Sequence, residues 1–118
     1  SSVESEKMDL VSAIKSTFEL CGTELTTTEG YPGWTPNPES SIVKLMSSLY
    51  TDLFEGKPQV NACQAGLECG ILGKHYPEME MISFGPNIQG PHSPDETVQI
   101  SSVQKFWTFL LETLKKVQ

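Results

Sequence analysis

Three long stretches of the chain carry apolar residues three or four positions apart, the spacing of an amphipathic helix. The first covers residues 4–21 and has acidic side chains in its first turn, where the positive end of the helix dipole favours them. The second is expected to be capped by Asn37, with Pro38 as its first residue, and to end before Gly56. The third follows a capping box at residues 101–104 and continues to the final lysines. Its wide apolar face is expected to consist of Val103, Phe106, Trp107, Leu110, Leu111 and Leu114. The pattern therefore predicts three helices, each with one apolar face.

Shorter stretches between these helices have the composition of strands. Residues 23–29 are rich in β-branched threonine and contain one large apolar side chain, which favours an edge strand. Residues 59–63 and the apolar run 79–84 are also expected to be strands, and a short helix should follow residue 64 and end near Tyr76. Alternating helices and strands predict an α/β fold.

The densest cluster of helix and strand breakers covers residues 30–38, where nine positions include three prolines and two glycines. Pro32-Gly33 within it is expected to form a type II turn. The cluster is our candidate for a domain junction, which would separate a helix and a strand, residues 1–33, from a second part, residues 34–118. One undivided domain would show the same pattern.

The charge pattern excludes some classes of partner. The 118 residues carry a formal net charge of −7, with eight lysines and no arginine. Nucleic-acid binding is therefore not expected, because phosphate recognition depends on clustered arginine and lysine. A substrate carboxylate is held best by a bidentate guanidinium, which would have to come from outside this chain. No apolar run approaches the roughly 20 residues needed to span a bilayer, so no membrane partner is expected.

One of the two histidines, His92, follows the predicted strand 79–84 in a stretch rich in turn-forming residues. Pro91 and Pro94 bracket it, and residues 93–96 (Ser-Pro-Asp-Glu) have the pattern of a capping box with proline at the first helical position. Ligands of open α/β folds bind beyond the carboxyl ends of strands, and a stiff turn suits a metal ligand. The pattern therefore indicates a metal-binding imidazole; the alternative is a polar loop histidine beside a helix cap.

The turn before the short helix offers two further candidates. Gly66 would let backbone N–H groups approach a ligand, and a helix N-terminus favours negative charge there, so this glycine is a candidate contact for an oxyanion or carboxylate. Glu68 lies at the same helix N-terminus, where it would either anchor the amino group of a substrate or simply be stabilised by the helix dipole. His75, beside Lys74, is better explained as a cation at the helix C-terminus than as a ligand.

The chain has three cysteines, Cys21, Cys63 and Cys69, an odd number without Cys-x-x-Cys spacing. Neither a disulfide framework nor a thiolate zinc site is indicated, and reduced thiols in a cytoplasmic protein are the simpler interpretation. A thiol hydrolase that pairs Cys63 or Cys69 with His92 would be a further hypothesis, but no recognised nucleophile motif supports it.

Three motifs stand in order along the chain, namely Tyr31-Pro-Gly-Trp34, Ala65-Gly-Leu-Glu-Cys-Gly70 and Ser83-Phe-Gly-Pro…His92-Ser-Pro-Asp-Glu96. Together they resemble the C-terminal part of the aminoacyl-histidine dipeptidases, cytosolic zinc-dependent hydrolases of the carnosinase type. The resemblance spans essentially the whole chain. It implies that residues 1–33 are the end of a lid domain, a short α+β remnant. Residues 34–118 would form the C-terminal part of a two-metal catalytic domain, an α/β fold with a mixed sheet flanked by helices.

The resemblance also implies roles for particular residues and partners. In this family the histidine of the His-Ser-Pro-Asp-Glu motif is the last ligand of a two-zinc site, a role that falls here on His92. The other ligands and the general base would come from the N-terminal part of the same protein, the substrate would be an Xaa-His dipeptide bound near Gly66 and Glu68, and the lid would be the place for a homodimer contact. Where the family usually has a histidine, this chain has Gln64, which cannot titrate near neutral pH.

The ligand requirement limits what the isolated chain is expected to do. A zinc site needs at least three protein ligands, and the sequence contains only two histidines. The chain is also short for a complete peptidase, so we interpret it as part of a longer protein. We expect the isolated 118 residues to bind zinc weakly or not at all and to hydrolyse nothing. A different hypothesis is a non-catalytic α/β interaction domain that packs its helix faces against a partner; it predicts no metal dependence and an exposed apolar patch.

Overall fold

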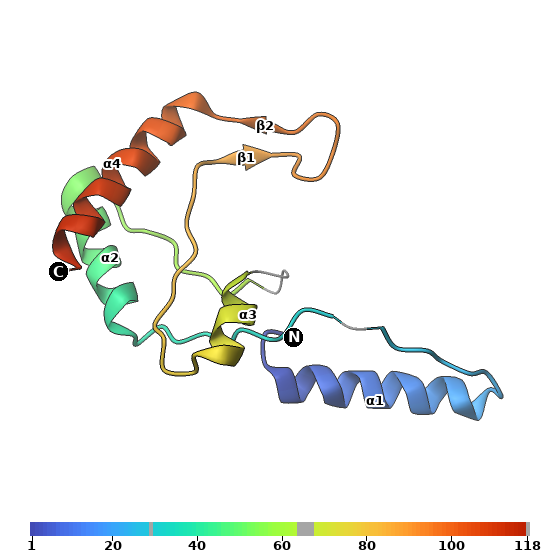
Figure 1. Cartoon of the computed structure of the whole chain (residues 1–118). Helices are drawn as coiled ribbons and strands as arrows, with labels where there is room; N and C mark the ends of the chain where they lie inside the picture. The colour runs from blue at the N-terminus through green and yellow to red at the C-terminus, as the bar shows by residue number, and fades with distance from the viewer. Residues whose placement is uncertain (29, 64–67, 118) are drawn as a thin grey trace. The chain divides into compact units, whose positions relative to one another are not determined.

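The computed structural model describes residues 1–28, 30–63 and 68–117. They form two compact units, one made of Ser1–Pro38 and Val60–Met81 and the other of Glu39–Gln59 and Ile82–Gln118. In the part of the chain described, no helix is both long and apolar enough to cross a membrane. The elements in chain order are α1 (Glu4–Leu20), α2 (Ser41–Phe54), α3 (Glu68–His75), β1 (Ile88–Gln89), β2 (Thr97–Val98) and α4 (Ile100–Lys116) (Figure 1).

The first unit begins with α1, which forms where the sequence predicted a helix. Acidic residues Glu4 and Glu6 lie in its first turn, and the helix ends at Cys21, before Gly22 adopts a positive φ of 73°. None of the residues of α1 is buried. Apolar side chains of the predicted face are instead at the surface, Met8 and Phe18 among them.

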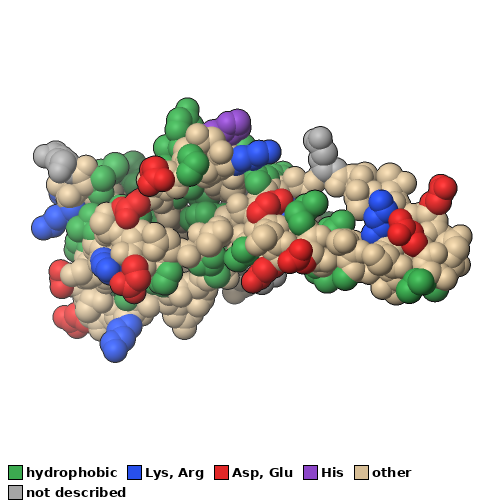
Figure 2. Space-filling view, turned by 90° about the horizontal axis from the view of Figure 1, so that it is seen from below, with side chains coloured by type: hydrophobic (Ala, Val, Ile, Leu, Met, Phe, Trp, Pro, Cys, Tyr) green, Lys and Arg blue, Asp and Glu red, His purple; other side chains and the backbone are tan. Residues whose placement is uncertain are grey.

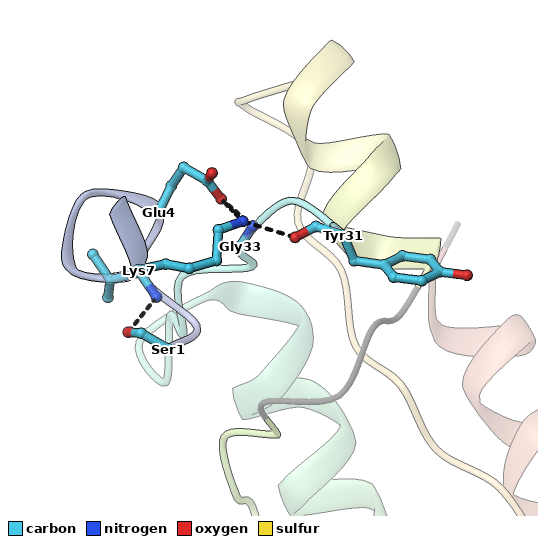
Figure 3. A network of polar contacts seen from close by, with 6 residues as sticks. Ser1, Glu4, Lys7, Tyr31 and Gly33 are labelled. Atoms are coloured by element: carbon cyan, nitrogen blue, oxygen red, sulfur yellow. Dashed lines mark hydrogen bonds and ion pairs between the residues drawn. The ribbon is translucent and has the colours of Figure 1, made fainter. Parts of the chain in front are cut away.

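A small network of polar contacts ties the start of α1 to the segment around Gly33 (Figure 3). One carboxylate oxygen of Glu4, Oε2, accepts hydrogen bonds from the backbone N–H of Gly33 at 2.6 Å and from Nζ of Lys7 at 2.7 Å. Lys7 Nζ also donates to the carbonyl oxygen of Tyr31 at 2.8 Å. The hydrogen bond from Lys7 and then that from Gly33 lower the pKa of Glu4, because both stabilise the ionised carboxylate.

The prediction of a type II turn at Pro32-Gly33 is wrong. Such a turn needs a positive φ at its third residue, and Gly33 is not among the described glycines with positive φ. The glycine is required for close packing instead, since a Cβ there would lie 2.6 Å from the backbone oxygen of Ser2. A Cβ on Gly70 of α3 would likewise lie 2.6 Å from the carbonyl oxygen of Pro32. Two glycines thus let three backbone segments of the first unit approach one another.

The second unit is built on the packing of α2 against α4. Met46, Leu49 and Phe109 are its buried apolar residues, and the rings of Tyr50, Phe54 and Phe84 surround Phe109 in edge-to-face contacts with centroids 5.6, 6.2 and 5.4 Å away. Lys105 Nζ lies 4.5 Å from the ring centroid of Tyr50 and 4.4 Å from that of Phe54, so a cation covers the edge of this cluster.

The ends of α2 differ in part from expectation. Its N-cap is Ser40, whose Oγ accepts a hydrogen bond from the N–H of Val43 at 3.4 Å, so the predicted cap at Asn37 is wrong by three positions. Ser40 replaces it because Oγ of this residue lies next to the unpaired N–H groups of the first turn. The C-terminal end before Gly56 is confirmed, with Glu55 as a left-handed cap at φ 53°.

Strand formation differs most from the sequence prediction. Within the described residues, the only ladder is the antiparallel pair β1 and β2, with Ile88 opposite Val98 and Gln89 opposite Thr97. The strands predicted at residues 23–28, 59–63 and 79–84 do not form there. A strand requires a hydrogen-bonding neighbour, and no other described segment pairs with them.

The fold class can therefore be stated only at a coarse level. Helices together with a short strand pair are compatible with the α/β class. The larger mixed sheet flanked by helices stays a prediction. So does the division into the end of a lid domain, residues 1–33, and part of a catalytic domain, residues 34–118.

Candidate functional site

His92 lies in the loop that connects β1 to β2, residues 90–96 (Figure 1). The loop is closed by its own hydrogen bonds. The backbone N–H and Oγ of Ser93 donate to the carbonyl oxygen of Gly90 at 3.2 and 2.7 Å, and the N–H of Glu96 donates to the carbonyl oxygen of Ser93 at 3.1 Å. These bonds make the loop a succession of tight turns.

The helix predicted to begin at Pro94 does not form, because Thr97 already belongs to β2. In a capping box the glutamate side chain accepts a hydrogen bond from the backbone N–H of the cap residue. Glu96 makes such a bond, but to His92, the residue before the predicted cap Ser93. Its carboxylate oxygen Oε2 accepts a hydrogen bond from the backbone N–H of His92 at 2.8 Å. The sequence pattern at residues 93–96 predicts a helix cap, whereas in the structure the Glu96 side chain closes a turn.

The backbone of His92 adopts a left-handed conformation, with φ 64°. This region is disfavoured for residues with a Cβ, at a cost of about 1–3 kcal/mol, although histidine occurs there more often than most residues. The residue is exposed, and the described part of the chain provides no hydrogen-bond or charged partner for its imidazole. Both ring nitrogens are therefore accessible to a ligand.

The base of the hairpin is fixed to the start of α4. The N–H of Gln99 donates to the carbonyl oxygen of Asn87 at 3.0 Å, and Asn87 Nδ2 donates to Gln99 Oε1 at 3.1 Å. Oγ of Ser102 accepts from the N–H of Asn87 at 2.8 Å and donates to the carbonyl oxygen of Gln99 at 2.7 Å. Three of these hydrogen bonds thus hold Asn87, at the base of the hairpin, to the first turn of α4 and its N-cap.

The bonds of Ser102 also correct a sequence prediction. The capping box predicted at residues 101–104 is wrong, because α4 begins at Ile100 and its N-cap Gln99 makes no side-chain cap bond. Ser102, expected inside the box, uses its hydroxyl to connect the helix to Asn87. The helix therefore begins two residues earlier than predicted, with only Gln99 between it and β2.

As a metal ligand, His92 fits by its chemistry. A neutral imidazole is a common ligand for zinc, and this one is exposed on a hydrogen-bonded turn. The described residues include no group of three histidine, cysteine, aspartate or glutamate side chains that could hold an ion. His92 therefore fits as one contributor to a shared site and does not form one with its described neighbours.

The two predicted substrate contacts belong to the first unit. Glu68 is the first residue of α3, as predicted, and its exposed side chain has no hydrogen-bond partner among the described residues. Gly66 lies outside the described residues, as does Gln64. His75 is the last residue of α3 and follows Lys74, which confirms the predicted pair of basic residues in its final turn.

The three cysteines form no disulfide with one another. Cys21 and Cys63 are exposed, whereas Cys69, in the first turn of α3, is half-buried. The three cysteines belong to the first unit and His92 to the second. The thiol-hydrolase hypothesis therefore gains no support.

Comparison with known proteins identifies the family to which this chain belongs. Residues 5–116 match the peptidase family M20/M25/M40, and the chain belongs to that family. Among curated proteins it is 44% identical over 115 residues to the cytosol non-specific dipeptidase of Escherichia coli (strain K12). That alignment covers 98% of this chain and 24% of the relative, so the chain spans about a quarter of the relative's length. The expected membership of a metallopeptidase family is confirmed.

Proposed function

We propose that this chain forms part of a zinc-dependent dipeptidase that hydrolyses Xaa-His dipeptides in the cytoplasm. In this proposal His92 supplies one imidazole to a two-metal centre. The remaining metal ligands and the general base come from other parts of the whole protein. The observation that carries the proposal is the exposed His92 imidazole on a hydrogen-bonded hairpin, in a chain that belongs to a peptidase family.

Each proposed residue has a separate role. When bound, a pair of divalent ions would lower the pKa of a water molecule and so supply the nucleophile for amide hydrolysis. His92 would hold one of these ions through a ring nitrogen, and the hydrogen-bonded hairpin would keep that ring in place. Glu68, at the start of α3, offers a carboxylate to the free amino group of the substrate. Gly66, which lies outside the described residues, is the proposed contact for the substrate's negative end.

The non-catalytic interaction domain is the competing function. Exposed apolar side chains are present as it predicts, for example Trp107 and Leu114 on α4, and apolar side chains appear at the surface between charged ones on the face in Figure 2. The same exposure fits a chain that packs against further parts of a larger enzyme. Family membership favours the peptidase.

Substitution of His92 by alanine in the whole protein tests the metal role. We expect kcat/KM to fall by more than about 100-fold and the zinc content to drop, because removing a metal ligand costs more than removing a residue that only orients one. His75→Ala is the matched control, since His75 is the only other histidine and ends α3. A His92→Ala protein that kept both its zinc and its activity would contradict the proposal.

Substrate preference needs a separate measurement. The relative's name describes it as non-specific, whereas the sequence motifs resemble enzymes that prefer a C-terminal histidine. Hydrolysis rates for a panel of dipeptides that share one N-terminal residue, with and without C-terminal histidine, separate these two cases. Equal rates across the panel would replace the Xaa-His assignment by a broad dipeptidase while leaving the metal role of His92 intact.

The proposed role of Glu68 predicts a different change. Glu68→Gln should raise KM for dipeptides with a free amino group by about tenfold, since a charge-assisted bond contributes about 1.5–3 kcal/mol. N-acetylated dipeptides lack the ammonium group and should show no such change. An equal effect on both substrate types would remove Glu68 from the substrate site.

The proposal also keeps a homodimer contact in the lid portion, residues 1–33, which sedimentation of the whole protein would test.

A further inference from the structure

The carboxylate of Glu96 holds the backbone of the residue that we assign to the metal. Glu96 Oε2 accepts the hydrogen bond of the His92 N–H at 2.8 Å, across a loop in which every residue from Pro91 to Glu96 is exposed. We propose that Glu96 is a positioning residue, which fixes the left-handed backbone of His92 and thereby the direction of its imidazole. This inference rests on the proposed metal role of His92.

Packing cannot provide this orientation. A buried side chain is held by its neighbours, but His92 and the residues on both sides of it are exposed. The two prolines do not provide it either. Pro91 fixes only its own φ, and Pro94 restricts the residue before it, Ser93. The φ of His92, 64°, is set by neither ring.

The hydrogen bond to Glu96 acts on the peptide plane that defines this φ. The N–H of His92 must point toward the far end of the loop for the bond to form, and a residue with a Cβ otherwise prefers negative φ. Without the carboxylate, the loop would be expected to relax to such a conformation and turn the imidazole away. The bond at Glu96 therefore favours the ring orientation before any ion arrives.

Other polar groups of the loop do not make this contact. Ser93 uses its hydroxyl on the carbonyl oxygen of Gly90, at 2.7 Å. The neighbouring carboxylate, Asp95, makes no hydrogen bond or ion pair with a described side chain or backbone group. Glu96 is thus the one described acceptor for the His92 N–H, and Asp95 is a natural comparison for the effect of charge alone.

The experiment separates the reach of the side chain at position 96 from its charge. Glu96→Asp keeps the charge but shortens the side chain by one methylene, so the carboxylate no longer reaches the His92 N–H. Glu96→Gln keeps the length and an acceptor oxygen but removes the charge. Asp95→Asn removes a charge from the same loop without removing the bond. Zinc affinity of the whole protein is measured for each variant by competition with a chromogenic chelator.

We expect Glu96→Asp to weaken zinc binding by about tenfold, in the range typical for residues that orient a metal ligand, while Glu96→Gln and Asp95→Asn remain near wild type. Absorption spectra of the cobalt-substituted protein should change in Glu96→Asp at saturating metal, which a general loss of stability would not cause. Wild-type affinity in Glu96→Asp, an unchanged cobalt spectrum, or an equal loss in Glu96→Gln would overturn the positioning role.

The same measurement on His92→Ala distinguishes the two proposals. Loss of zinc in His92→Ala together with wild-type affinity in Glu96→Asp overturns the positioning role alone. Full zinc affinity in His92→Ala overturns the metal role, and the inference about Glu96 with it.

Discussion

At Gly33 the main chain passes so close to the start of α1 that a methyl group would not fit. An added Cβ would lie 2.6 Å from the backbone oxygen of Ser2 and 2.9 Å from the backbone nitrogen of Glu4. Backbone atoms cannot move aside as the end of a flexible side chain can. The residue type at this position is therefore determined by close approach between segments that are about 30 positions apart in sequence.

Gly33→Ala should accordingly destabilise the first unit. We expect a loss of about 1–3 kcal/mol in the free energy of unfolding, as for other overpacked sites, measured by urea denaturation. Gly30→Ala is the matched control, because a Cβ there has no heavy atom within 4 Å, and it should leave stability unchanged or slightly raised. Equal effects of the two substitutions would show that the close approach is not maintained in solution.

The carboxylate of Glu4 makes the same junction dependent on pH. Its pKa is lowered from 4.5 by the hydrogen bonds from Lys7 and Gly33. A group whose pKa is lower in the folded state stabilises that state above the unfolded value and loses this effect as the pH falls through the folded value. The contacts should therefore be complete at neutral pH and weaken only below about 4.5.

The amide proton of Gly33 reports directly on the ionisation of the Glu4 carboxylate. Its NMR chemical shift should titrate with a midpoint below 4.5, because its acceptor is the Glu4 carboxylate. The titration should disappear in Glu4→Gln and persist in Glu19→Gln, which changes a carboxylate in the last turn of α1. A midpoint at or above 4.5 would contradict the lowered pKa.

At the scale of the element, the sequence predicts the helix α4 correctly but the wrong side of it as buried. The sequence predicts one wide apolar face for this helix, with Trp107 and Leu111 on it. In the structure Phe109 and Thr113 are the buried residues, and Trp107 is 57% exposed. Spacing alone could not determine the buried side, because apolar residues surround so much of this helix that several rotations are compatible with the pattern.

Phe109→Ala should therefore cost far more stability than Trp107→Ala. Phe109 is 9% exposed and contacts three aromatic rings, so we expect a loss of about 3–5 kcal/mol in the free energy of unfolding. Trp107 lies on the same helix and should lose less than about 1 kcal/mol. Denaturation of both variants checks this order, and the reverse order would mean that α4 packs through its predicted face.

Strands were predicted less well than helices for a related reason. A helix satisfies its backbone hydrogen bonds within one segment, so α1 and α2 appear where their periodicity predicts them. A strand depends on a neighbour that may be distant in sequence. β1 and β2 pair across a short loop, whereas the threonine-rich residues 23–28 have no described partner strand.

At the scale of the whole molecule, the number of metal ligands limits what the 118 residues can do alone. One imidazole is the only assigned ligand, and the described residues contain no cluster of three. We expect calorimetry with zinc to show only weak binding, and we expect no dipeptide hydrolysis by the isolated chain. His92→Ala provides the background for both measurements. Tight one-to-one binding that disappears in His92→Ala would show that ligands within this chain were overlooked.

The sequence by itself determined the family, through motifs that need no knowledge of packing, and it located the helices, whose hydrogen bonds are local. It also made His92 the candidate metal ligand, since the flanking prolines and the motif are properties of adjacent residues. Only the tertiary structure showed that Gly33 is required for close packing, that Phe109 is the buried ring of α4, and that Glu96 bonds to His92 instead of capping a helix. These three features depend on which atoms meet in space, and residue spacing does not determine that.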